Sequence, residues 1–370
     1  MKTKILLRTT FTLVLGLLIT VTNASGQNAP VRYRVIDLGE DSTANDITDS
    51  GRIGGSKNFG GTLRHAAFWP NTHSLPIDLG TLPGDMGSNG FSINPRGQIV
   101  GQSYPSDGSR VRPLFWSPQS GPIELPGLPA GFSPAADINP AGQIVGQFIP
   151  FDESGVWPVF WSNSNTAAIY LPRVSNQFPN GVAVSINDRG SILGDACTAD
   201  FSECHAAFWA NRTSTPVALA SPGGDFIYTD IGLTTDFVFA HALNNAGSMV
   251  GFAYNADFSQ NRAVYWASSS SPAVILSTSG QFPNGDAAGI NDQRQIVGTA
   301  YNSDFSAIHA FFWPSPTSPG IDLNTVIPPG SGLELIQARS INNRGEISGG
   351  AYLNGVPPGH AVVLVPIPRH

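Results

Sequence analysis

One segment of the chain combines carboxylates with aromatic rings, a pairing suited to holding sugars. It runs from Ser221 to Phe239 with the sequence SPGGDFIYTDIGLTTDFVF. An aromatic ring there could stack on a sugar while the acids accept hydrogen bonds from its hydroxyls. Alternatively, the aromatic side chains only pack the segment against its neighbours, and this interpretation is favoured. The candidate ligand-binding residues of the segment are Asp225, Phe226, Tyr228, Asp230 and Asp236.

Further candidates come from the pentapeptide QFPNG, which occurs at 177–181 and again at 281–285. It contributes Phe178 and Phe282 as ligand-binding candidates, and Asp286 follows the second copy. The repetition indicates a contact used twice or, as the favoured interpretation, a turn used twice. If Asp286 converged with the carboxylates of the longer segment, they could act as the acid and base of a polysaccharide hydrolase or lyase.

Five loops share the pattern D-x-S, with the aspartate nine residues before a tryptophan. Carboxylates gathered on one face would suit calcium, a hard cation that takes oxygen ligands. The stronger interpretation is that the Asp and Ser side chains cap N–H groups of their own turn, because each copy belongs to a different repeat. We therefore expect no metal and no other cofactor. The five aspartates are Asp107, Asp152, Asp200, Asp257 and Asp304.

The two cysteines, Cys197 and Cys204, stand with six residues between them. In an exported chain this spacing predicts a local disulfide across a hairpin loop. A zinc site is disfavoured because zinc takes four ligands and only His205 is adjacent.

The remaining histidines do not form a convincing catalytic or metal-binding set. Four of them recur at one repeated position, yet other copies place Arg or Trp there, which indicates packing. His241 could act as an acid or base beside the longest segment, although a core role is favoured. P-loop, G-x-S-x-G, H-E-x-x-H and C-x-x-C motifs are absent from the sequence. The four repeated histidines are His65, His205, His309 and His360.

The N-terminus has the pattern of a secretory signal peptide. Lys2, Lys4 and Arg8 precede a short apolar run, and small residues follow near Ala24. Without residues 1–24 the chain keeps 16 Lys and Arg against 26 Asp and Glu. This acidic balance argues against nucleic acid as a partner. We expect a secreted protein, extracellular or periplasmic, that inserts in no membrane and is a monomer.

Seven copies of the pattern I-N-x-x-G-x-I-x-G organise the rest of the chain. Apolar residues alternate on both sides of a turn in which Asn starts the turn and Gly accepts a left-handed backbone, so each copy predicts an antiparallel hairpin. Copy six has Arg294 at the Gly position. The copies begin at Ile47, Ile93, Ile138, Ile186, Leu243, Ile290 and Ile341.

Two more short strands follow each hairpin. One ends in an aromatic residue, as in HAAFW at 65–69, and the next contains a triplet such as IDL at 77–79. We name the four strands a, b, c and d in chain order. Four short strands in each of seven repeats predict an all-β, seven-bladed β-propeller with antiparallel blades.

The ends of the chain suggest how the ring closes. The N-terminal strand 33–38 contains an IDL triplet before the first hairpin, while the last repeat lacks one after residue 365. We therefore predict that 33–38 completes the last blade and removes its free edge. The predicted organisation is a signal peptide at 1–24, a short lead at 25–32 and one propeller at 33–370.

His309-Ala310-Phe311 and its counterparts resemble the HAF-repeat family of bacterial extracellular proteins. The resemblance covers the mature chain and implies export and a repeat fold, but no catalytic residues. Some copies depart from the pattern, since Arg112, Trp157 and Arg262 replace the His, and Leu364 replaces the final Trp. The strand order also resembles that of WD-type propellers.

The loops between strand d and the next strand a are the only connections whose length varies widely. The Leu of the strand d triplet and the first residue of the next hairpin copy are 9 to 24 residues apart. The other connections keep almost constant length. Repeat proteins commonly bind on the face that tolerates insertions. We therefore expect a binding module for a glycan or an extracellular protein. The alternatives are the hydrolase or lyase and a scaffold without catalytic activity. The variable segments are 39–44, 80–90, 126–135, 172–183, 220–240, 277–287 and 324–338.

Overall fold

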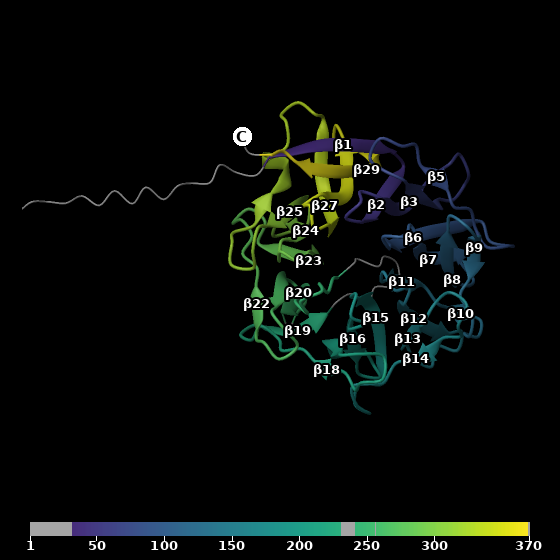
Figure 1. The fold of residues 1–370 in the computed structure, drawn as a ribbon. Coiled ribbons are helices and arrows are strands. Elements are labelled where there is room, and N and C mark those ends of the chain that lie inside the picture. Colours follow the sequence, from purple (N-terminus) through teal and green to yellow (C-terminus); the bar gives the residue numbers. More distant parts are fainter. Residues whose placement is uncertain (1–31, 231–240, 256, 369–370) are drawn as a thin grey trace, which may run out of the picture. The chain divides into compact units, whose positions relative to one another are not determined.

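The computed structural model describes residues 32–230, 241–255 and 257–368, and the side chains of 227–230 are not described. The predicted signal peptide lies outside these residues. Residues 31–370 form one compact unit. Within it, seven antiparallel sheets stand around a central axis (Figure 1). The chain is a seven-bladed β-propeller, as its repeats predict.

Each blade contains the four predicted strands. Strands a are β2 (Ser42–Ile47), β6 (Gly87–Ile93), β10 (Gly131–Phe132) with β11 (Ala135–Ile138), β15 (Asn180–Ile186), β19 (Phe226–Asp230), β23 (Asn284–Ile290) and β27 (Leu333–Ile341). Strands b are β3 (Ile53–Lys57), β7 (Ile99–Tyr104), β12 (Ile144–Pro150), β16 (Ile192–Cys197), β20 (Met249–Asn255), β24 (Ile296–Tyr301) and β28 (Ile347–Leu353). Strands c are β4 (His65–Trp69), β8 (Arg112–Ser117), β13 (Trp157–Trp161), β17 (Cys204–Trp209), β21 (Asn261–Trp266), β25 (Ile308–Trp313) and β29 (Val356–Pro366). Strands d are β5 (Ile77–Asp78), β9 (Gly121–Glu124), β14 (Ile169–Tyr170), β18 (Val217–Ala218), β22 (Ala273–Ile275), β26 (Ile321–Asp322) and β1 (Tyr33–Glu40).

The N-terminal strand closes the ring, which confirms the prediction. β1 pairs antiparallel with β29, with Tyr33 opposite Pro366. The Tyr33 ring is buried and meets Phe312 of the preceding blade edge to face, with the ring centroids 6.2 Å apart. Figure 1 shows β1 beside β29, so the two ends of the propeller lie in one sheet. This pairing covers the edge that strand c of the last blade would otherwise expose.

The tryptophans that end strands c form the core between blades. Trp161 is fully buried, and its indole N–H donates to the carbonyl oxygen of Pro126 at 2.9 Å. Pro126 follows strand d of the preceding blade. The Trp161 ring therefore fills the space between the two blades and also forms a hydrogen bond across it. The same bond links Trp209 to Pro172 at 2.8 Å. Buried Trp rings dominate such interfaces through their large apolar area.

The asparagine of each I-N copy links neighbouring blades. Its Oδ1 accepts N–H groups of its own turn, as Asn291 does from Gln293 and Gln295. Its Nδ2 donates to the equivalent backbone carbonyl of the next blade, as Asn291 does to Asn342 at 3.0 Å. We call these side chains the asparagine belt. Its members are Asn94, Asn139, Asn187, Asn244, Asn291 and Asn342.

Several strands a begin earlier than the sequence pattern suggests. The segment predicted as a variable loop at 277–287 already contains the start of β23, and β27 begins inside the segment 324–338. In the longest segment, Phe226–Asp230 is strand β19, paired with β20. These residues were expected in loops. They form strands because partners on strand b extend just as far, which no pattern within strand a reveals.

Candidate functional site

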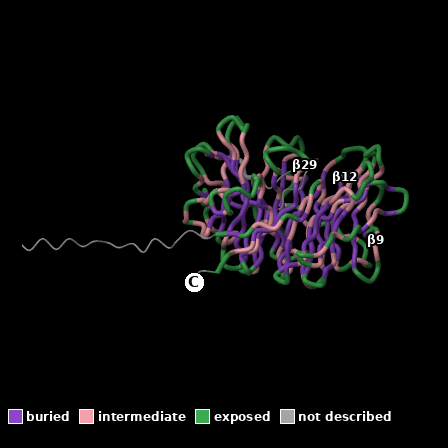
Figure 2. The backbone as a smooth tube through the Cα atoms, turned by 90° about the horizontal axis from the view of Figure 1, so that it is seen from above, coloured by how far each residue is buried: buried purple, intermediate pink, exposed green. Residues whose placement is uncertain are grey.

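The two ends of the ring carry different connections. In β23 and β24, Asn284 pairs with Tyr301 at one end, and Ile290 pairs with Ile296 at the other. The d-to-a and b-to-c loops therefore share one end, which we call the loop face, and the I-N turns lie at the opposite end. Figure 2 shows exposed residues collected at these ends and buried strands between them.

The middle of the channel offers little room for a ligand. Its cavity measures about 110 Å³ and is lined by residues of all seven blades. Typical ligand pockets measure roughly 300–1,000 Å³. Several polar groups on this wall bond to one another. The Ser92 Oγ lies 2.6 Å from Asp137 and 3.1 Å from Asp46. The two ends of the ring offer more open surface than this cavity does (Figure 2).

Asp137 illustrates how these channel carboxylates are held. Burial raises its pKa, and the charge of Asp46 adds to the rise. Opposing this, its oxygens accept the Ser92 hydroxyl and the backbone N–H of Ile186 at 2.7 Å. These bonds join three different blades, so this cluster fixes the blades relative to one another.

Asp286 lies closer to the loop face, inside β23 and not in a loop as expected. It is buried, and the Tyr301 hydroxyl donates to its Oδ2 at 2.9 Å. Burial raises the pKa of Asp286 to about 6, although Tyr301 and the positive charge of Arg339 oppose the rise. Burial also lowers the pKa of Arg339 to about 10. This carboxyl therefore titrates near the working range of a general acid or base.

Of the carboxylate candidates in the longest segment, only Asp225 has a described side chain. Asp225 is exposed in the turn before β19, and the ring of Phe226 is half-buried under the Arg262 guanidinium at 5.0 Å. Tyr228 and Asp230 belong to β19, but their side chains are not described. Asp236 lies outside the described residues. The convergence of carboxylates on Asp286 remains a prediction.

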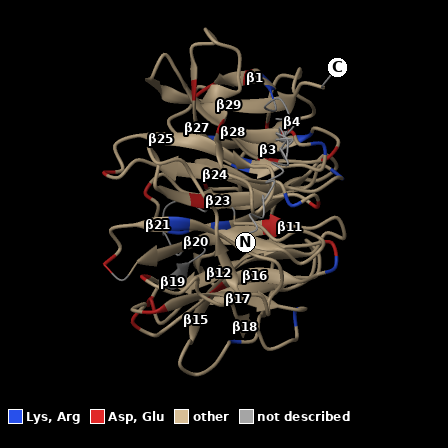
Figure 3. Cartoon of the chain, turned by 90° about the vertical axis from the view of Figure 1, so that its left-hand side faces the viewer, with Lys and Arg blue, Asp and Glu red and all other residues tan. Residues whose placement is uncertain are grey.

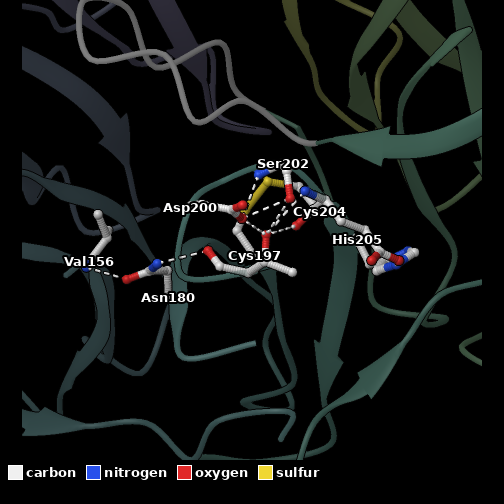
Figure 4. Close-up of a disulfide and its surroundings, with 9 residues drawn as sticks. Val156, Asn180, Cys197, Asp200, Ser202, Cys204 and His205 are labelled. Carbon is white, nitrogen blue, oxygen red and sulfur yellow. Dashed lines mark hydrogen bonds and ion pairs between the residues drawn. A yellow bond between two sulfur atoms is a disulfide. The ribbon is translucent and has the colours of Figure 1, made fainter. Parts of the chain in front are cut away.

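The two QFPNG copies have structural contacts. Phe282 is 2% exposed and stacks against His309, with the ring centroids 4.4 Å apart. Phe178 is half-buried and meets His205 edge to face at 5.3 Å. Each ring thus packs on a histidine of strand c, in keeping with a reused turn. Asn180 adds a second link between blades, since it accepts the N–H of Val156 at 3.0 Å (Figure 4).

Cys197 and Cys204 form the predicted disulfide, which joins the end of β16 to the start of β17 (Figure 4). The loop that it closes is one of the D-x-S loops. There Asp200 accepts the N–H of Ser202 at 3.1 Å and its hydroxyl at 2.7 Å. The bond from the serine N–H recurs in all five D-x-S loops.

These bonds support the capping interpretation of the D-x-S pattern. Hydrogen bonds from Ser202 and Thr198 lower the pKa of Asp200 to about 2. Within the described ranges, no group of three or more His, Cys, Asp or Glu side chains has the arrangement of a metal site.

Three of the four repeated histidines pair with acids of strand d, a relationship that we did not infer from the sequence. The fourth, His205, pairs with Glu203 of its own b-to-c loop. His309 Nδ1 lies 2.7 Å from an Asp322 oxygen, and His360 Nδ1 lies 2.9 Å from Asp37 across the closing strand. Arg112 and Glu124 make the equivalent pair in blade two at 3.0 Å. The signal was present in the sequence, because in four of the seven blades a basic residue in strand c accompanies an acid in the IDL or IEL triplet.

A set of exposed phenylalanines was also missed. The most exposed phenylalanines of the described residues all lie in b-to-c loops, with exposed fractions from 37% to 58%. Large apolar side chains exposed in the same type of loop are typical of an interaction surface. Acidic residues also stand at the tips of several loops (Figure 3). The five phenylalanines are Phe59, Phe151, Phe201, Phe258 and Phe305.

Solved structures with similar folds include other propellers. A puromycin hydrolase aligns with a TM-score of 0.56 and 10% identity over 90% of this chain and 53% of its own. An oligogalacturonate lyase from Vibrio parahaemolyticus aligns with a TM-score of 0.55 and 8% identity over 91% and 97% of the two chains. TolB from Acinetobacter baumannii aligns with a TM-score of 0.43 and 9% identity over 73% of this chain and 65% of its own. The similarity establishes the fold alone.

The chain thus spans about half of the hydrolase and 65% of TolB. No protein-family model and no curated protein matches the sequence. Among the residues with described structure, no helix has the length and apolar character needed to cross a membrane.

Proposed function

We propose that the chain is an exported HAF-repeat propeller that binds an extracellular ligand, a glycan or a protein, through its loop face. The observation that supports this most directly is the placement of the exposed phenylalanines in b-to-c loops. Single exposed apolar residues are common on protein surfaces. Five in equivalent loops of five blades, three of them at the same position in the loop, are better explained by binding, since the other loops of this face vary in length. Aromatic residues are enriched where proteins meet their partners.

Export is supported by three features. The N-terminal segment has the charge and apolar pattern of a signal peptide. The disulfide Cys197–Cys204 is of a kind that persists in oxidising compartments. The HAF-repeat resemblance points to the same location.

Residues of the d-to-a loops extend the proposed surface. Asp225 is exposed at the loop end of blade five. Phe226, Tyr228 and Asp230 continue from it along β19. Together with Asp236, these residues stay our candidates for ligand contact from strand a. Phe178, Phe282 and Asp286 would act instead through the packing described above.

The proposal is tested by screening the mature chain on arrays of glycans and of extracellular proteins. Ligand binding should be lost when all five exposed phenylalanines are changed to Ser. Leu75→Ser is the matched control, because Leu75 is 87% exposed in the c-to-d connection of blade one, at the end opposite the loop face. Equal binding by the five-residue variant, or loss of binding in the control alone, would refute the proposed face.

A polysaccharide hydrolase or lyase is the second candidate, and Asp286 is the observation that favours it. A carboxyl with a pKa of about 6 can exchange a proton near neutral pH. Its neighbours Tyr301 and Arg339 could bind an oxygen-rich substrate. Asp286→Asn should then abolish release of reducing or unsaturated sugar ends. Unchanged turnover in this variant would exclude the role, and absence of turnover in the parent would leave the binding function alone.

A further inference from the structure

Three of the exposed phenylalanines occupy the same position in three consecutive blades. Phe201, Phe258 and Phe305 are the central residues of D-F-S loops in blades four, five and six. Their exposed fractions are 45%, 58% and 46%. All three have a left-handed backbone, with φ values of 56°, 58° and 58°.

Folding does not account for phenylalanine at this position. A left-handed backbone is unfavourable for a bulky residue and free of penalty for glycine. Blade two has Gly108 at the equivalent position with φ of 63°. About half of each side chain is also exposed, so each gains less from burial than a core phenylalanine does. An unfavourable conformation that recurs together with an exposed aromatic ring points to function.

The loops hold these rings in place before any ligand arrives. Phe258 and Phe305 lie against Tyr254 and Tyr301, with ring centroids 5.3 Å and 5.6 Å apart. In blade four, Cys197 of the disulfide occupies the equivalent place in strand b. The Asp side chain of each loop accepts the N–H of the Ser that follows the Phe. Such preorganisation reduces the entropy lost on binding.

The charge of the three loops selects against acidic ligands. Residues 198–203, 255–260 and 302–307 contain acids and no Lys or Arg. Hydrogen bonds from serine lower the pKa of the Asp in each loop, so the carboxylates stay ionised at neutral pH. In these bonds the Asp Oδ1 accepts the serine hydroxyl, and a carboxylate has the capacity to accept further hydrogen bonds.

We propose that the three D-F-S loops bind an uncharged polysaccharide, with each ring stacked on one sugar and each Asp accepting a sugar hydroxyl. This inference rests on the proposed binding function and names its ligand class. A ring face contacts the apolar C–H face of a sugar, and an ionised acid tolerates a neutral polymer better than a uronate. Three equal loops suit a ligand built of equal units, because simultaneous contacts multiply affinity.

The test compares the mature chain with Phe201→Gly, Phe258→Gly and Phe305→Gly, singly and together. The probes are laminarin, dextran and galactomannan as uncharged polymers, polygalacturonate as an acidic one, and phosphatidylcholine vesicles. Binding to at least one uncharged polymer is expected. Each single variant should weaken it about 2- to 10-fold, as expected for one aromatic contact. The triple variant should weaken it at least about 100-fold through lost multivalency.

Two controls separate contact from folding. Glycine relieves the left-handed backbone, so melting temperatures of the Gly variants should not fall. Gly108→Phe creates a fourth D-F-S-like loop in blade two and should strengthen binding to the same polymer.

Binding that survives in the triple variant would overturn this inference and leave the proposed function standing. Tighter binding to polygalacturonate, or phenylalanine-dependent binding to vesicles alone, would overturn the ligand class. If the parent chain binds no polysaccharide and no protein on the arrays, both proposals fail together.

Discussion

Asn342 donates its side-chain amide to the backbone carbonyl of Thr48 at 2.9 Å, across the seam between the last blade and the first. This bond continues the asparagine belt over the point where the chain ends meet. Thr48 replaces asparagine at its own position. Its hydroxyl accepts the N–H of Arg52 at 3.1 Å, as Asn94 accepts that of Gln98. A threonine hydroxyl supplies this acceptor but not the amide that would reach the next blade, so the belt is incomplete at blade one.

Completing the belt should stabilise the ring. Thr48→Asn is expected to raise the free energy of unfolding by about 1 kcal/mol, the typical gain from one hydrogen bond. Asn342→Ala should lower it by about 1–3 kcal/mol, because buried backbone groups lose their partners. Denaturant unfolding followed by tryptophan fluorescence measures both. Asn176→Ala, at an exposed asparagine in the loop before β15, serves as the control. A destabilised Thr48→Asn variant would contradict this account of the seam.

Arg294 occupies the glycine position of the I-N turn in blade six with φ of 62°. The same position in blade five is Gly247 with φ of 83°. Arg294→Gly should therefore raise the free energy of unfolding by up to about 1 kcal/mol, since glycine adopts this backbone without strain. Gly247→Ala should change stability in the opposite direction. A lower unfolding midpoint for Arg294→Gly would show that the arginine side chain contributes more than its backbone costs.

Removing the closing strand should destabilise the whole propeller. Without residues 25–39, β29 loses its partner β1 and the buried Tyr33. We expect a fall in melting temperature of more than about 10 °C, given that a few kcal/mol shift a domain of this size by several degrees. Removal of residues 25–31 alone is the control and should not change the melting temperature. An unchanged melt after the longer truncation would mean that β1 does not hold the ring closed.

The disulfide should contribute measurable stability in spite of its short loop. Cys197→Ser with Cys204→Ser is expected to cost about 2–3 kcal/mol by the loop-entropy relation. The reductant dithiothreitol should shift the unfolding midpoint of the parent chain by the same amount and leave the double variant unaffected. A parent chain insensitive to reductant would show that the bond adds nothing to stability.

Asp286 should make stability depend on pH. Burial raises its pKa to about 6, above the ordinary value of about 4, so the folded state prefers the protonated carboxyl. The protonated carboxyl contributes fully to the free energy of unfolding below about pH 4, and this contribution is lost as the pH rises through about 6. The free energy of unfolding of the parent chain should therefore fall by about 2–3 kcal/mol between pH 4 and pH 7 because of this carboxyl, and Asp286→Asn should remove that fall.

The measurement is denaturant unfolding from pH 4 to pH 7 for both chains. Asp225→Asn, at an exposed aspartate, should follow the parent curve. If the curve of Asp286→Asn runs parallel to that of the parent chain throughout, the pKa of Asp286 is not raised in the folded state.

The sequence by itself determined the blade count, the four strands of each blade, the closing strand and the disulfide. These features depend on the alternation of apolar and polar residues, on the residues that form turns and on the spacing of the repeats. Seven copies repeat each of these local patterns. The left-handed glycine of the I-N turn was predictable for the same reason. Even the pairing of His309 with Asp322 left a trace, because both residues recur together within one repeat.

Only the tertiary structure decided what surrounds each side chain. The amide of Asn291 reaches a carbonyl 51 residues away, in the next blade. Asp286 follows a turn motif and seemed a loop residue by its neighbours in sequence, yet its paired strand b extends β23 around it and buries it. Phe258 has an ordinary sequence context and a strained, exposed position. Burial, pKa and backbone strain arise from partners far away in the chain, and a repeat pattern records only the partners inside one repeat.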